Sequence, residues 1–95
     1  MKQGKYMLRL MAEAADAPQE LLPGTSLIEI TGMGRVLIEN QKGVTLYERD
    51  LIRVKLHGGY AVIRGSCLTI ARMEKRQLVI TGTIQGVELE RGAGC

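Results

Sequence analysis

Apolar and polar residues alternate along residues 27–43, LIEITGMGRVLIENQKG. A period of two is typical of β-strands that bury one face. The Gly-Met-Gly triplet at 32–34 interrupts the alternation and can reverse the chain. If Thr31 lies opposite Arg35, the apolar positions of the two strands coincide, so the pattern predicts a β-hairpin. The apolar pairs expected in this register are Ile30 with Val36 and Ile28 with Ile38.

A second turn signal follows at once. The loop Gln41-Lys42-Gly43 ends on a glycine, which suits a left-handed backbone conformation. It predicts a hairpin that places Ile38 opposite Leu46. The polar residues 48–50 then separate two further strands.

Glycines also mark the turns of the second half of the chain. Gly58-Gly59 predicts a tight turn that places Val54 opposite Ile63. Gly65-Ser66 predicts another tight turn. Residues 81–90 contain two glycines and are interpreted as one bent strand rather than as a hairpin.

These turns all keep the apolar residues on one face of the sheet, and this agreement supports the strand assignment. The expected fold is all-β, an antiparallel meander curled into a barrel or half-barrel, because one short helix cannot cover a one-faced sheet. The positions expected to be buried are Ile28, Ile30, Val36, Ile38, Leu46, Ile52, Val54, Ile63, Leu68, Ile70 and Ile80.

Residues 5–15, KYMLRLMAEAA, place Met7, Leu10, Met11 and Ala14 at helical spacing and predict a short N-terminal amphipathic helix. Such a helix can cap the sheet, or it can dock on a membrane surface or a partner protein. The expected organisation is a helix and Pro/Gly linker at 1–24, a β-meander domain at 25–90 and a flexible tail at 91–95.

The composition bounds the class of protein. The chain has 95 residues, enough for one small domain, and 45% of them are hydrophobic, with no Trp or Phe. The net charge of +3 arises from 13 basic and 10 acidic residues, a mild bias that suits an acidic partner or an anionic lipid surface.

No apolar run reaches membrane-spanning length, and no signal peptide is visible. Cys67 and Cys95 form no CxxC pair and suit reduced thiols, so we expect a cytoplasmic protein.

The sequence offers no arrangement of residues for catalysis. His57 is the only histidine, and no nucleophile or carboxylate cluster is placed beside it, as a catalytic triad or a metal site requires. The glycines at 32–34 lack the rest of a dinucleotide-binding fingerprint, and residues 40–43 lack the spacing of a phosphate-binding loop. We therefore expect no catalytic residues, no cofactor and no metal.

Two candidate surfaces remain. One is basic and carries an aromatic ring, so it can hold phosphates and stack a base, although a solvated strand face is the simpler explanation. Its residues are Arg53, Lys55, Tyr60 and Arg64, with His57 beside them. The other surface carries outward apolar residues, which usually mark a protein interface. Its residues are Leu37, Tyr47 and Val62, joined by Met7 and Leu10 of the N-terminal helix.

The sequence resembles the YabP/YqfC family of sporulation proteins from endospore-forming bacteria, most closely the YqfC branch. The resemblance extends from about Ala17 to Glu90, and its most specific segment is IENQKG at 38–43 within the longer match VLIENQKGV at 36–44. The family tends to carry a histidine where this chain has Gln41, so we assign that side chain no role. The other matching segments are Pro18 to Leu22, Ile28 to Gly32, Ile52-Arg53-Val54, Ile63-Arg64-Gly65, Leu68-Thr69-Ile70 and Ile80 to Ile84.

The resemblance implies a small protein made in the mother cell during sporulation that acts in assembly of the spore envelope or coat. It implies no enzymatic activity. It also implies association with a membrane-bound sporulation protein of the YqfD type, so we expect this chain as a peripheral protein at the forespore membrane. The outward apolar residues also allow a homo-oligomer. The alternative is a small β-barrel that binds nucleic acid through the basic face, and the salt dependence of binding separates the two. A small hydrolase is disfavoured, because no nucleophile and base are paired.

Overall fold

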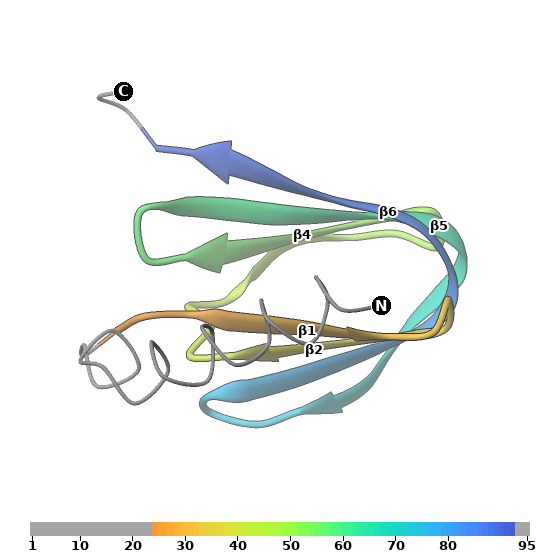
Figure 1. Ribbon diagram of the computed structural model, residues 1–95, viewed down its shortest axis with the longest axis horizontal. Coiled ribbons are helices and arrows are strands. Elements are labelled where there is room, and N and C mark those ends of the chain that lie inside the picture. The colour runs from red at the N-terminus through yellow and green to blue at the C-terminus, as the bar shows by residue number, and fades with distance from the viewer. Residues whose placement is uncertain (1–23, 93–95) are drawn as a thin grey trace, which may run out of the picture.

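The computed structural model describes residues 24–92, which form one antiparallel sheet of six strands in the order β1-β2-β6-β5-β4-β3. The sheet curls on itself without closing, and β1 and β3 are its two ends (Figure 1). The expected all-β, antiparallel, curled fold is therefore confirmed. The strands are β1 (Leu27–Thr31), β2 (Arg35–Glu39), β3 (Val44–Tyr47), β4 (Leu51–Leu56), β5 (Gly59–Met73) and β6 (Gln77–Arg91).

The two long strands β5 and β6 form one hairpin that bends over and divides the sheet into two layers (Figure 1). The first layer contains β3, β4 and the parts of β5 and β6 at 59–66 and 83–91. The second layer contains β1, β2 and the parts of β6 and β5 at 77–82 and 69–73. Both long strands therefore contribute to both layers.

Glycine and β-bulges make the bend possible. The pairing of β5 with β6 shifts register at three places, which locally bends a strand. Cys67 and Gly82 adopt positive φ angles of 54° and 138° at this point. A Cβ atom added to Gly82 would lie 2.6 Å from the carbonyl oxygen of Cys67, so the two backbones approach too closely for a side chain.

The core lies between the two layers. Of the positions expected to be buried, most are fully enclosed, and Ile28 and Ile70 pack partly buried against them. Leu46 is only half-buried. Ile30 was expected in the core but is 52% exposed, because it lies on an edge strand beyond the cover of the first layer. The core cluster consists of Val36, Ile38, Ile52, Val54, Leu56, Ala61, Ile63, Leu68, Leu78 and Ile80.

The first predicted hairpin is confirmed, and the second is wrong. β1 pairs with β2 in the expected register, with Thr31 opposite Arg35. The other edge of β2 pairs with β6 rather than with β3, so Ile38 lies opposite Leu78 and not Leu46. Residues 41–43 instead carry the chain from β2 in the second layer to β3 in the first. The long-range pairing with β6 overrides the local turn signal, which carries no information about strand order.

The remaining turn predictions divide in the same way. His57 and Gly58 form the turn between β4 and β5, so Val54 lies opposite Ala61, two positions from the expected register. The faces survive this error because side chains alternate with a period of two. No turn occurs at Gly65, where β5 continues through the bend, so the expected Gly65-Ser66 turn is wrong. The expected bent strand at 81–90 is confirmed as part of β6, which extends to Arg91.

Candidate interaction surfaces

The predicted basic face exists on the outside of the first layer. The pairing of β4 with β5 places Lys55 opposite Tyr60, and Arg53 stands on the same face. The Cζ atom of Arg53 lies 3.7 Å from the centroid of the Tyr60 ring, a cation–π contact. The structure therefore brings together the side chains that the sequence assigned to this face.

Glutamates from β6 offset much of the positive charge on this face. Arg53 donates from Nε and Nη2 to Oε1 of Glu90, at 3.2 and 3.0 Å. Arg64 donates from Nε to Oε1 of Glu88 at 2.7 Å. This hydrogen bond and the negative charge of Glu88 raise the pKa of Arg64. Two of the three cations expected to bind phosphate thus already hold carboxylates. This arrangement disfavours the nucleic-acid interpretation.

The glutamates belong to the site, although the sequence alone did not reveal it. Glu88 and Glu90 share one face of β6, which by itself resembles a solvated edge. Their partners follow only from the β5–β6 register, in which Tyr60 lies opposite Glu90 and Val62 opposite Glu88. A sequence reading that ends β5 at Gly65 cannot find this register.

The three apolar residues expected to form a partner surface differ in exposure. Val62 faces away from the core, yet it is only 3% exposed, since it lies in the row between Arg53 and Glu88. Leu37 is half-buried opposite Val79 on the outside of the second layer. The structure does not bring the three residues together as one patch. Met7 and Leu10, the other members of the predicted surface, lie outside the described residues.

Tyr47 has a specific position at the edge of the first layer. It is 51% exposed, and its hydroxyl oxygen accepts a hydrogen bond from the backbone N–H of Ile70 at 3.0 Å. Ile70 belongs to the part of β5 in the second layer. Tyr47 therefore ties β3 to the opposite layer along one side of the molecule, and its ring is a fixed structural contact.

The segment 38–43, which carried the most specific part of the family resemblance, wraps around the turn between β5 and β6. The backbone N–H of Asn40 donates to the carbonyl oxygen of Arg76 at 2.6 Å. Asn40 adopts a left-handed φ of 62°, a conformation that asparagine tolerates better than most residues. Its side-chain Nδ2 donates to the carbonyl oxygen of Thr25 at 2.8 Å. Asn40 thus fastens the start of β1 and the β5–β6 turn to the end of β2.

Gln41 has a role that the sequence analysis did not assign. Its side chain is enclosed, with 8% of the residue exposed. Its Oε1 accepts a hydrogen bond from the N–H of Gly43 at 2.7 Å, and its Nε2 donates to the carbonyl oxygen of Glu74 at 3.2 Å. Both bonds hold backbone groups, so Gln41 shapes the connection from β2 to β3. No sequence motif marks this role, because Glu74 is distant along the chain.

The polar groups within residues 24–92 form no metal site of three or more His, Cys, Asp or Glu side chains. His57 is exposed in the turn between β4 and β5, beside Gly24. Cys67 is exposed and free, and Cys95 lies outside the described residues. The same part of the chain has no helix long and apolar enough to cross a membrane.

Comparison with known proteins identifies the family. The model of the YabP family matches residues 23–94, most of the chain and every strand of the sheet. The chain belongs to the YabP family. A Bacillus subtilis (strain 168) relative, named Uncharacterized protein YqfC, is 25% identical over 77 residues, covering 81% of this chain and 83% of that protein. No solved structure matches the chain. The Asn40–Gln41 connection of this YabP-family chain lies well inside the matched region.

Proposed function

We propose that this YabP-family protein is a non-catalytic module that acts by binding protein during sporulation, in assembly of the spore envelope or coat. Family membership supports the biological setting, the mother cell and the forespore membrane. The polar side chains described above are engaged in structural contacts: Asn40 and Gln41 hold backbone groups, and the outer arginines hold glutamates. This favours a binding role over a catalytic one.

The open edge of β1 is the observation that carries this proposal. Within residues 24–92, β1 pairs with β2 on one side only and stands at the end of the sheet. Leu27 on its outer face and Ile30 on its inner face are 57% and 52% exposed. An edge strand with exposed apolar residues pairs readily with a strand from another chain, and native proteins usually guard such edges with Lys, Pro or a bulge. β1, LIEIT, has no Lys, Pro or bulge, and Glu29 is its one charged residue.

An extended segment of the partner would add a strand beside β1 and cover Ile30. This mode of recognition takes its affinity from backbone hydrogen bonds and its specificity from alternate side chains. A membrane-bound sporulation protein of the YqfD type is the first partner to test, and a second copy of this chain is the next.

A pull-down from sporulating cells tests the proposal with tagged wild type, Ile30→Lys and Met33→Lys. Ile30→Lys places a charge on the free edge, and Met33→Lys changes an apolar residue that is 82% exposed in the β1–β2 turn. We expect wild type and Met33→Lys to retain the same partner and Ile30→Lys to lose it. Equal retention by all three proteins contradicts docking at β1. Retention of nucleic acid alone would restore the alternative function.

A further inference from the structure

One end of the molecule collects three chain connections, and we call it the loop end. It comprises the β2–β3 connection at 40–43, the β4–β5 turn at 57–58, the β5–β6 turn at 74–76 and the strand residues that adjoin them, at the left of Figure 1. Backbone hydrogen bonds hold these pieces together: Asn40 N–H to Arg76, Lys42 N–H to Lys55, and Gly92 N–H to Gly58. The loop end is therefore one surface.

The net positive charge of the described residues is concentrated at the loop end. Apart from the two Arg–Glu pairs described above, the rest of the structure carries three basic residues, Arg35, Arg49 and Arg72, and three acidic residues, Glu29, Glu48 and Asp50. At the loop end two carboxylates, Glu39 and Glu74, face a larger basic set. That basic set consists of Lys42, Lys55, Lys75, Arg76 and Arg91.

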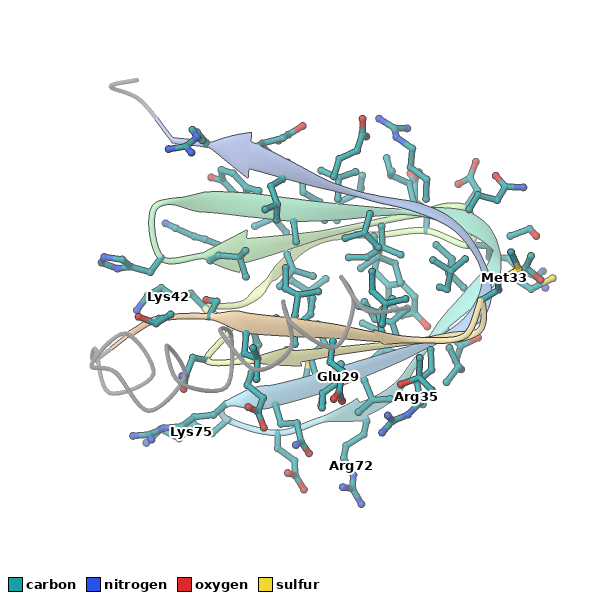
Figure 2. All side chains as sticks on the ribbon, viewed as in Figure 1. Glu29, Met33, Arg35, Lys42, Arg72 and Lys75 are labelled. Atoms are coloured by element: carbon teal, nitrogen blue, oxygen red, sulfur yellow. The ribbon has the colours of Figure 1, made fainter. Side chains whose placement is uncertain are left out.

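The basic side chains of this set have no partner among the described residues. Within residues 24–92, none of them forms a side-chain hydrogen bond or an ion pair. Lys42 and Lys75 extend from the same end of the molecule in Figure 2, opposite to Met33 at the bend. Mobile lysines at one end of a small domain can follow a diffuse negative surface.

Exposed apolar residues stand among these charges. Met73, which is 54% exposed, lines an open hollow together with Lys42 and Lys75. Leu89, which is 69% exposed, lines a second hollow with His57 and Arg91. Apolar side chains within a basic surface are typical of proteins that bind at the lipid–water boundary, where lipid phosphates pair with the cations.

The first and last described residues, Gly24 and Gly92, both lie at this end of the molecule. Gly24 lies beside His57, and Gly92 is bonded to Gly58. The sequence of residues 5–15 combines an apolar pattern with Lys5 and Arg9, the composition of a membrane-surface segment. The loop end and this sequence thus suit the same kind of surface.

We propose that the loop end docks on an anionic lipid bilayer. Nucleic acid suits it less well, because Tyr60, the aromatic ring nearest to this end among the described residues, is already stacked under Arg53. Docking in this orientation leaves the β1 edge at the side of the molecule, where it stays open to a protein partner.

Sedimentation of the full chain with lipid vesicles tests this proposal. Vesicles of phosphatidylcholine are compared with vesicles in which part of this lipid is replaced by phosphatidylglycerol. We expect binding to the anionic vesicles only, weakening as salt is added. A basic residue near an anionic surface changes the affinity by about fivefold, so Lys42→Gln with Lys75→Gln should weaken binding by roughly 25-fold.

Arg35→Gln with Arg49→Gln is the matched control. It removes the same amount of charge from the opposite end of the molecule, near the bend of β5 and β6. We expect it to change the affinity by less than about twofold, since both side chains then point away from the bilayer. The melting temperature of each variant is measured as a control for folding. Equal binding to neutral vesicles, or an equal loss in both double variants, overturns the proposal. A wild type that ignores vesicles but binds DNA or RNA assigns the loop end to nucleic acid and overturns it as well.

Discussion

The bend between the two layers depends on Gly65, and Gly65→Ala tests this directly. Gly65 is buried in β5 at the bend, where it lies opposite Ile84 of β6. An added Cβ would collide with the carbonyl oxygen of Thr83 and lie 3.0 Å from its carbonyl carbon and 3.1 Å from Cδ2 of Leu68. The first two atoms belong to backbone, so the strands themselves must separate to admit the methyl group.

The expected cost follows from this geometry. Overpacking of a close-packed site costs about 1–3 kcal/mol of unfolding free energy, and occasionally more. For a domain of this size each kcal/mol lowers the melting temperature by about 4–8 °C. We therefore expect Gly65→Ala to lower the melting temperature by roughly 5–20 °C. Circular dichroism during heating and during urea titration measures both quantities.

Gly86→Ala is the control for this substitution. Gly86 also lies in the β5–β6 hairpin, but an added Cβ there meets no atom within 4 Å. We expect a change within about 0.5 kcal/mol, or a small gain from the reduced entropy of the unfolded chain. Equal stability of Gly65→Ala and Gly86→Ala would contradict the close approach of the Gly65 and Thr83 backbones.

Three further predictions concern stability and use the same denaturation assay. Val54→Asp should prevent folding, because an unpaired carboxylate at a fully buried position costs several kcal/mol, on the order of a small domain's stability, whereas Lys55→Asp on the exposed face should fold. A folded Val54→Asp protein would refute the strand faces. Gln41→Ala should cost about 1–3 kcal/mol, because it leaves the N–H of Gly43 without its partner, and an unchanged midpoint argues against this contact. Gly58→Val should cost about 1 kcal/mol or more, since φ at this turn is +87°, and wild-type stability would contradict the turn.

The sequence predicted those parts of the fold that depend on local alternation. The β1–β2 register and most of the core follow from it, because a strand's two faces can be read without knowing its neighbours. The order of strands could not be read in the same way. Gly58 forms a sharp turn, whereas Gly65 allows two strand backbones to approach closely within a continuous strand. The local sequence does not distinguish these two roles of glycine.

The candidate surfaces show the same limit. Arg53, Tyr60 and Arg64 could be placed on one face from the β4–β5 hairpin alone. Their partners Glu88 and Glu90 could not, because they arrive from β6 through the bend. The exposure of Ile30 on β1 could not be predicted either, since it depends on whether the sheet closes and on how far the opposite layer extends.

The two-layer fold depends on the pairing of β2 with β6, because this pairing places β1 and β2 in the layer opposite β3 and β4. Nuclear Overhauser contacts between backbone protons measure it directly. The structure predicts contacts between Leu37 of β2 and Val79 of β6, which lie opposite each other. Contacts between Ile38 and Leu46, with none between Leu37 and Val79, would place β3 beside β2 and contradict the two-layer fold.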